Sequence, residues 1–293
     1  MLRADGVRCS ATVISESSTL ALPPGIDLLT VPMGSKLSKI RHLLASGRVG
    51  AGIYVCVVDS DVRLDLHACR DLIRATMQGR YGIGFGVVES AGGTRWLDGC
   101  IALDKRLSHR IWRPLLHRLG VGITVPGQFV VYGPELLHGA PHLTETYLDD
   151  LYFGLRCRTL DLPFLRQDKV VCRESGRTAW STLLGQRIRW MKGLFRLAWA
   201  ASRGLGGWHY CAIHYALYHG IPMAAGVGLA VLAAGGAWMA ALALALAGTL
   251  TLAGLRLTFY PLAILYLITF PVIHLLATLG AVLPISVTRL RRR

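Results

Sequence analysis

The chain has 293 residues, 53% of them hydrophobic, and carries 32 lysines and arginines against 17 acidic residues. So many apolar residues exclude an ordinary cytosolic enzyme, and the length allows one substantial core with an appendage or two small domains. The formal charge of +15 would suit nucleic-acid binding. However, the basic residues lie beside an apolar C-terminal region rather than in an arm with interleaved aromatics. This favours membrane lipids as a partner and no nucleic acid.

The seven cysteines are scattered, odd in number and without a CxxC pair. This pattern argues against a disulfide framework and against a structural zinc site. Reduced thiols predict that the polar part of the chain faces the cytoplasm.

Residues 1–180 are predicted to form an α/β domain, because short apolar runs alternate with amphipathic stretches. Strands are expected at 10–17, 26–32, 52–60 and 81–90, and helices at 36–47 and 65–79, closed by Gly47 and Gly79. The run at 52–60 reads as a strand buried on both faces. Such alternation indicates a mostly parallel sheet flanked by helices, in which ligands gather at the carboxyl ends of the strands.

Residues 181–207 are predicted to form an amphipathic helix. Apolar side chains recur at helical spacing from Leu184 to Ala198, beside a basic stripe from Arg189 to Arg203. An apolar stripe beside a basic one is typical of a helix in a membrane interface. The alternative is a helix that packs on a core and exposes its basic face.

Residues 208–293 contain two long apolar runs and the basic tail RLRRR. As one helix, 221–254 would extend about 50 Å, against about 30 Å of hydrocarbon. It is therefore either an overlong tilted helix or a hairpin that turns near Gly235 and Gly236. The second run, 258–285, is also long enough to span. If the tail stays cytoplasmic, the number of spans is even, so two are favoured over three.

Asp59 and Asp61 follow the apolar run at 52–60, at the carboxyl end of an expected strand. Two carboxylates in such a loop can hold a hard divalent cation that bridges the phosphates of a nucleotide. The alternative is a solvated turn.

Three later stretches bear on this choice. Asp149 and Asp150 open an expected helix, where acids are also ordinary partners of the helix dipole. GQFVVYGPELLHG (127–139) places a glycine before an apolar strand, as a backbone floor beneath a ligand requires. QRIRW (186–190) places an arginine and an indole on the amphipathic helix, where they suit phosphate oxygens and an apolar ligand face.

The order DSD, GQFVVYGPELL, LDDLYFGLR, QRIRW and apolar helices resembles the membrane-associated family 2 glycosyltransferases. That family includes hyaluronan, chitin and cellulose synthases, and ceramide glucosyltransferases are similar. The resemblance covers roughly residues 11–200 and extends loosely beyond. It implies a GT-A fold, a nucleotide-sugar donor that is usually UDP-linked, Mg²⁺ or Mn²⁺, inversion at the anomeric carbon, and a lipid or saccharide acceptor.

The resemblance also implies roles for individual residues. Asp59 and Asp61 match the DxD pair that binds the donor and the metal, with Asp61 as the direct ligand. Asp150 matches the general base, with Asp149 beside it. The remaining matches are Gln186, Arg189 and Trp190 for the QxxRW motif, Lys36 or Lys39 for the diphosphate, and Gly127, Gln128 and Trp190 for the acceptor. For the two lysines, exposed helix positions are the alternative.

Two departures from the family pattern bear on function. The usual first apolar strand is expected to be missing, which leaves Glu16 where a uracil-contacting aspartate would stand. No membrane helix is expected before the catalytic part, and this expectation favours transfer of one or a few sugars over polymer export. The alternatives are a non-catalytic membrane scaffold with the same fold, a processive synthase with a partner pore or oligomer, and a peripheral lipid-binding protein.

Two other patterns are set aside. GIGFG (82–86) lies inside an expected strand, so it lacks the context of a dinucleotide loop. The segment 208–220 gathers His209, Cys211, His214 and His219 without a metal-ligand spacing, which favours an interfacial belt.

Overall fold

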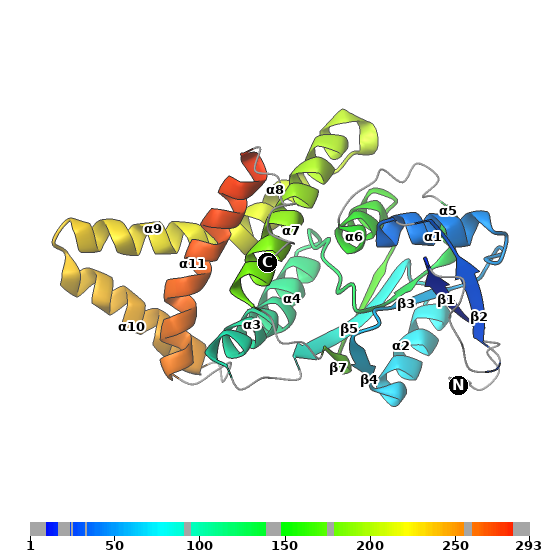
Figure 1. Ribbon diagram of the computed structural model, residues 1–293, viewed down its shortest axis with the longest axis horizontal. Coiled ribbons are helices and arrows are strands. Elements are labelled where there is room, and N and C mark those ends of the chain that lie inside the picture. The colour runs from blue at the N-terminus through cyan, green and yellow to red at the C-terminus, as the bar shows by residue number, and fades with distance from the viewer. Residues whose placement is uncertain are drawn as a thin grey trace. The chain divides into compact units, whose positions relative to one another are not determined.

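The computed structural model describes residues 10–16, 24, 26–32, 34–90, 95–138, 148–174, 179–254 and 260–283. These residues form a mixed α/β fold (Figure 1). The chain divides into two compact units: unit 1 is Met1–Val87 with Val125–Cys172, and unit 2 is Val88–Thr124 with Arg173–Arg293. The segment 88–124 therefore groups with the C-terminal region, although the sequence predicted one continuous domain over 1–180.

The strands form two sheets. In the smaller sheet, β1 (Ala11–Ser15) pairs in parallel with β2 (Ile26–Thr30). The larger sheet has the order β3-β6-β5-β7-β4. Its strands are β3 (Val55–Val58), β4 (Val62–Leu64), β5 (Ile83–Ser90), β6 (Phe129–Tyr132) and β7 (Phe164–Glu174).

Strand β6 runs antiparallel to both of its neighbours, since Tyr132 lies opposite Val55 of β3 and Ile83 of β5. At this point the sheet departs from the mostly parallel arrangement that was expected. Strand β3 lies at the edge of the sheet and leaves Val58 45% exposed. The prediction that it is buried on both faces is therefore wrong. An apolar run predicts a strand but not its place in the sheet, and an edge strand has only one neighbour.

The first two helices begin and end where the sequence predicts. Helix α1 (Lys36–Ala45) begins after Ser35, whose side chain accepts a hydrogen bond from the Ser38 N–H, and is followed by Gly47 at a φ of 71°. Helix α2 (Leu66–Gln78) begins after Asp65, whose carboxylate accepts from two backbone N–H groups, and Gly79 ends it.

Unit 1 also contains α5 (Pro134–His138) and α6 (Asp149–Thr159). Its core includes Phe85 of β5, Tyr132 of β6 and Phe153 of α6, all fully buried. The rings of Tyr132 and Phe153 lie 4.4 Å apart. This contact fixes the start of α6 against the end of β6.

Unit 2 is helical apart from the ends of β5 and β7. Its first helices are α3 (Trp96–Leu107), η1 (Ser108–Trp112) and α4 (Arg113–Arg118). The rest are α7 (Trp180–Ala200), η2 (Ala201–Leu205), α8 (Trp208–Tyr215), η3 (Ala216–Gly220), α9 (Ile221–Ala234), α10 (Trp238–Gly254) and α11 (Tyr260–Val282).

The run 221–254 is a hairpin rather than one overlong helix, which was the second expected alternative. Gly235 ends α9, and Gly236 adopts a φ of 79°, which a residue with a side chain rarely tolerates. Within the described residues, Trp208–Ala234 and Pro261–Val282 are long and apolar enough to cross a membrane. The RLRRR tail lies outside the described residues.

Helix α7 packs along α11. Its buried face includes Leu183, Ile188, Met191, Leu194 and Leu197, whereas Arg189 and Arg196 are exposed. The core-packing alternative therefore holds for this face within unit 2. A position of α7 at a membrane surface stays a prediction.

Candidate active site

Four segments of unit 1 bring charged groups together. Asp59 follows β3, Lys36 begins α1, Gly127 precedes β6 and Asp149 begins α6. The pairing of β3 with β6 places two of these segments side by side, because the Asp59 N–H donates to the Gln128 carbonyl at 3.0 Å. The sequence predicted each of these residues as a site residue, and the structure brings them together.

Lys36 connects the cluster. Its ammonium lies 2.8 Å from Asp59 Oδ1, 2.5 Å from the Gly127 carbonyl oxygen and 3.7 Å from Asp149 Oδ2. Burial by itself lowers the pKa of Lys36, but the negative charges of Asp149 and Asp59 outweigh it, and the pKa is raised above its ordinary value. Lys36 is therefore a fixed positive charge with three carboxylates around it, Asp150 being the third.

Asp149 is the most confined acid of the cluster. Its side chain is 16% exposed, and its buried Oδ2 accepts no hydrogen bond from the residues that the structure describes. Burial raises the pKa of Asp149 to about 6, and the neighbouring charge of Asp150 adds to this, whereas Lys36 opposes it. Asp150 differs, because its Oδ1 accepts the Leu151 N–H at 2.8 Å.

Gly127 leaves room beside the base candidate. A Cβ atom at this position would lie 3.6 Å from Asp150 Oδ2 and 3.6 Å from Lys36 Nζ, with nothing nearer among the described residues. The backbone at Gly127 thus passes close to both groups without filling the space beside them. This agrees with the expected backbone floor beneath a ligand.

Tyr132 is a neighbour that sequence reasoning missed. It is fully buried at the end of β6, and its hydroxyl has no hydrogen-bond partner within the described part of the chain. Burial and then the charges of Asp149, Asp150 and Asp59 raise its pKa well above the ordinary value. The phenol thus stays neutral. In the sequence, the only indication was that a tyrosine, which carries a hydroxyl, ends the apolar run FVVY.

The other predicted donor residues of unit 1 lie around this cluster. Lys39, one turn along α1, pairs with Glu16 at 3.1 Å, and both side chains are partly exposed. Asp61 is exposed in the turn between β3 and β4. Of the two lysines, Lys36 is the one held among the acids.

The DxD pair suits a hard divalent cation in its chemistry. No group of three His, Cys, Asp or Glu side chains that could hold a metal occurs within the described residues. Asp59 and Asp61 supply carboxylate oxygens, which Mg²⁺ and Mn²⁺ prefer, and Mg²⁺ sites commonly complete their shell with water and substrate phosphates. The two residues therefore fit a cation that arrives with a phosphorylated substrate.

The QRIRW segment lies on α7 in unit 2. Gln186 and Trp190 are half-buried, and Arg189 is exposed. Arg187 is buried and binds Asp104 Oδ2 of α3 at 2.6 Å, with its guanidinium 4.5 Å from the centre of the Trp190 ring. Sequence reasoning missed Arg187, because it fills a variable position of QxxRW.

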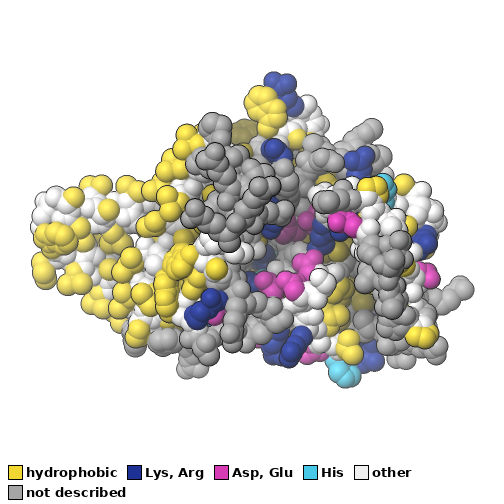
Figure 2. Space-filling view, in the orientation of Figure 1, with side chains coloured by type: hydrophobic (Ala, Val, Ile, Leu, Met, Phe, Trp, Pro, Cys, Tyr) yellow, Lys and Arg dark blue, Asp and Glu magenta, His cyan; other side chains and the backbone are white. Residues whose placement is uncertain are grey.

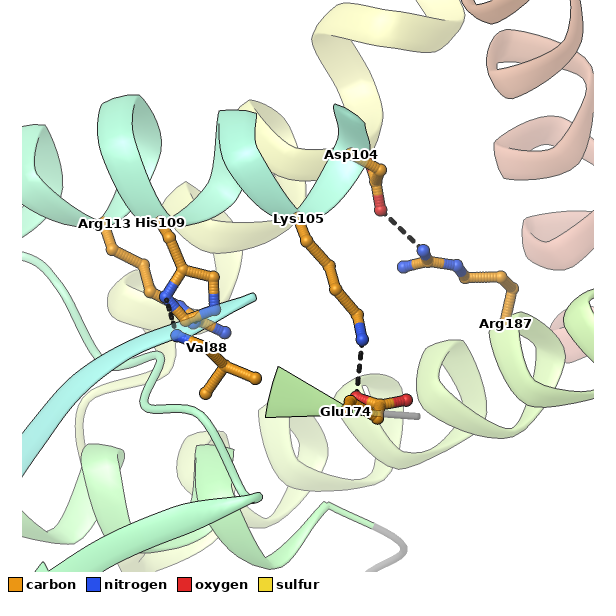
Figure 3. A network of polar contacts seen from close by, with 7 residues as sticks. All are labelled: Val88, Asp104, Lys105, His109, Arg113, Glu174 and Arg187. Carbon is orange, nitrogen blue, oxygen red and sulfur yellow. Dashed lines mark hydrogen bonds and ion pairs between the residues drawn. The ribbon is translucent and has the colours of Figure 1, made fainter. Parts of the chain in front are cut away.

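Figure 3 shows the polar contacts around the pair of Arg187 and Asp104. Lys105 of α3 binds Glu174 of β7 at 2.5 Å, next to the pair of Asp104 and Arg187. On α11, the Tyr266 hydroxyl donates to Asp104 Oδ1 at 3.0 Å. Asp104 thus has a partner for each carboxylate oxygen.

The two patterns set aside from the sequence have structural explanations. In GIGFG, a Cβ at Gly84 would meet Thr76 Oγ1 at 1.9 Å, so this glycine allows β5 and α2 to approach closely, as expected of strand packing. His214 and His219 are buried, so the interfacial-belt interpretation is wrong for them. Instead, His219 Nδ1 lies 2.9 Å from His274 Nδ1 of α11.

Comparisons with known proteins bear on the family and the fold. A family model described as "Glycosyl transferase family group 2" matches residues 54–284. A solved structure titled "Mannosyltransferase PcManGT from Pyrobaculum calidifontis in complex with GDP-Man and Mn2+" matches with a TM-score of 0.56 and 18% sequence identity, over 92% of this chain and 76% of that chain. No curated protein matches. The structural match shows a shared fold.

Proposed function

Because the chain belongs to glycosyl transferase family group 2, we propose that it moves a sugar from a nucleotide-sugar donor to a lipid or glycan acceptor at the cytoplasmic face of a membrane, with inversion. The observation that carries the proposal is the cluster in which Lys36 lies among Asp59, Asp149 and Asp150 beside the open backbone at Gly127. This arrangement supplies both a base and a cation for a diphosphate leaving group.

Asp150 is the general base of the proposed reaction. It removes the proton of the acceptor hydroxyl as that oxygen attacks the anomeric carbon. The absence of a side chain at Gly127, whose Cβ would lie 3.6 Å from this Oδ2, supports this role, since an acceptor hydroxyl must reach the carboxylate. Asp149 has the raised pKa, but its Oδ2 is buried and faces the Lys36 ammonium, so we assign it the role of tuning the charge of the site rather than contacting the acceptor.

Lys36 and the DxD pair act on the leaving group. Asp59 and Asp61 would hold Mg²⁺ or Mn²⁺, which supplies positive charge to the departing diphosphate. Lys36 adds a second positive charge on the same side, and its raised pKa keeps it protonated. One displacement, with base and leaving group on opposite sides of the sugar, inverts the anomeric configuration.

Helix α7 of unit 2 carries the QxxRW residues, for which we propose contacts with the substrates. Arg189 carries an exposed guanidinium suited to phosphate oxygens, and the half-buried indole of Trp190 offers a flat face to the sugar or acceptor. The buried pair of Arg187 and Asp104 supports this role, because it fixes the orientation of the Trp190 ring from behind.

Asp150→Asn tests the base. We expect it to reduce sugar transfer by on the order of a hundredfold to ten-thousandfold while donor binding stays close to that of the wild type. Release of nucleoside diphosphate should be measured with a panel of UDP- and GDP-sugars, since a structural neighbour was solved with GDP-Man. Asp168→Asn, at an 84% exposed carboxylate, is the matched control. Normal transfer by Asp150→Asn would refute the assignment.

Lys36→Met and Lys39→Met test the diphosphate contact. The two lysines lie on the same helix three residues apart, but only Lys36 joins the acid cluster. We expect Lys36→Met to weaken binding of nucleoside diphosphate with Mn²⁺ at least tenfold, by roughly 1.4 kcal/mol, and Lys39→Met to change it little. Equal effects would contradict the role of Lys36. No binding to the wild type at millimolar ligand would favour the non-catalytic scaffold.

A further inference from the structure

Helix α11 packs against the polar helices of unit 2 along nearly its whole length. Near its start, Leu262 lies against Gly99 of α3, where a Cβ would come within 3.0 Å of both leucine methyl carbons. Near its end, a Cβ at Gly280 would lie 2.9 Å from Ile188 of α7. The buried residues Leu97, Cys100, Leu183, Leu262, Phe270 and Ile273 form one cluster between these helices.

Charged and polar groups contact the middle of α11. The Tyr266 hydroxyl donates to Asp104, and the Arg187 guanidinium lies 5.9 Å from the centre of the Phe270 ring. The helices that carry these groups also expose Arg106 of α3 and Arg189 of α7. If α11 crossed a bilayer, Asp104 and Arg187, which lie against its middle, would be carried to hydrocarbon depth, where a charged side chain costs about 2.5–3.5 kcal/mol or more. This argues against α11 as a membrane span.

The opposite face of α11 is an exposed apolar stripe. Ile264, Ile268, Val272, Leu275 and Leu279 recur at helical spacing and are 40–63% exposed. A helix with one side on a polar body and the other side apolar suits a position along the membrane surface.

The α9–α10 hairpin packs against α11. Gly226 of α9 lies against Pro271, and Gly248 of α10 lies against Leu267. From these contacts the two helices converge on a tip at Gly235 and Gly236, away from α11 (Figure 1). Eight residues of α9 and ten of α10 lie beyond the contacts, which gives about 12 Å and 15 Å. The hairpin thus reaches about half of a 30 Å hydrocarbon core.

The turn at the tip pairs its own backbone donors and carries no charge. The N–H groups of Gly235, Gly236 and Ala237 donate to carbonyls of α9 at 2.9–3.2 Å, so the turn leaves none of these donors unpaired. Trp238 and Met239 beside it are 66% and 79% exposed. No charged residue occurs in 221–254, and hydrophobic side chains cover the projecting helices in Figure 2.

We propose that unit 2 binds a single leaflet of a lipid bilayer: the α9–α10 hairpin enters the hydrocarbon from one side, α11 lies along the surface, and neither crosses. The partner is the acyl-chain region of that leaflet. Both ends of α11 then stay on the same side of the bilayer. This replaces the expectation of two or three spans, which followed from length and hydropathy alone.

Two measurements test the proposal: on which side of the bilayer the two ends of the chain lie, and how deep Trp238 lies in the bilayer. Neither measurement depends on sugar transfer. The full chain, tagged at both ends, is added to sealed phosphatidylcholine vesicles, and an impermeant protease is applied outside. We expect both tags to be cleaved in the same vesicles. A protected C-terminal tag in vesicles that lose the N-terminal tag would overturn the proposal, because α11 would then cross.

Depth is read from quenching of Trp238 by lipids brominated either near the headgroup or near the methyl ends of the acyl chains. The Trp238 signal is the difference between the wild type and Trp238→Phe. We expect stronger quenching by the deep bromines, because the tip ends near the bilayer centre. Stronger quenching by the shallow bromines would mean a hairpin that crosses to the far headgroups, and equal absence of quenching would mean no insertion. Either result refutes the proposal.

Discussion

Asp149 is a buried carboxylate whose ionisation opposes folding. Its pKa is raised from 3.8 to about 6, first by burial and then by the charge of Asp150. Between about pH 4 and 6, the folded protein therefore binds this proton more tightly than the unfolded chain does. Stability from this group is fully present below pH 4, falls as the pH rises to about 6 and stays low above it.

Asp149→Asn should remove this dependence. We expect the variant to gain stability relative to the wild type as the pH rises from 4 to 6, by up to about 3 kcal/mol at pH 7. Melting temperatures of both proteins at pH 4.5, 5.5, 6.5 and 7.5 measure the gain. Asp168→Asn, at an exposed carboxylate, should show a constant difference. If the difference in melting temperature between Asp149→Asn and the wild type does not change with pH, ionisation of the Asp149 carboxylate does not destabilise the folded protein.

At this same scale, the sequence predicted residues that the structure brings together in unit 1, but not how the surroundings of these residues differ. Lys36 and Lys39 are equivalent in the helical pattern, and only the packing of α1 beside β3 and α6 places Lys36 among the acids. Asp149 and Asp150 are adjacent in the sequence, yet one is confined and the other accepts a backbone N–H. Arg187 and Tyr132 could not be found from the sequence, because their roles depend on Asp104 and on the acid cluster.

At the scale of elements, strand β6 is bounded by two glycines with different tasks. A Cβ at Gly133 would lie 2.5 Å from the Tyr81 carbonyl oxygen, a backbone atom that cannot easily move. A Cβ at Gly127 would make only ordinary contacts, but it would occupy the space beside Asp150 and Lys36. Gly133 is therefore required for packing, whereas packing does not require a glycine at Gly127, and we propose that a ligand does.

Alanine at each position should separate these tasks. We expect Gly133→Ala to lower the free energy of unfolding by roughly 1–3 kcal/mol, and Gly127→Ala to leave it nearly unchanged. Gly127→Ala should instead reduce kcat/KM for sugar transfer by on the order of tenfold to a hundredfold. Thermal melts and initial rates on both variants check this. Full activity in Gly127→Ala would show that no ligand uses the space at this glycine.

Helix boundaries and the hairpin were the most predictable elements, because glycines and capping side chains mark them locally. Ser35, Asp65, Gly47, Gly79 and the pair Gly235–Gly236 act within a few residues of their own positions. The direction of β6 and the edge position of β3 were not predictable, because they depend on strand pairings between residues more than forty positions apart. Local patterns thus predicted the elements better than their neighbours in the sheet.

At the scale of the whole molecule, hydropathy predicted attraction to a membrane but not how the chain would use it. A window of apolar residues describes α11 as a span, yet its buried face packs on helices that carry Asp104 and Arg187. The net charge of +15 adds a second attraction, to anionic lipid, which salt weakens. An uncharged bilayer separates the two contributions, because only the apolar one remains.

An arginine at the hairpin tip should therefore release the protein from neutral vesicles. Met239 is 79% exposed, so Met239→Arg should leave the fold intact, but near the bilayer centre the new charge costs about 2.5–3.5 kcal/mol. We expect about a hundredfold weaker binding to phosphatidylcholine vesicles, measured by flotation. Leu119→Arg, at a 63% exposed apolar residue after α4, adds the same charge outside the hairpin and should bind as the wild type does. If both variants float like the wild type, the tip does not enter hydrocarbon and α11 alone must hold the membrane. If both are released, the loss reflects added charge in general, and the hairpin has no special part in binding.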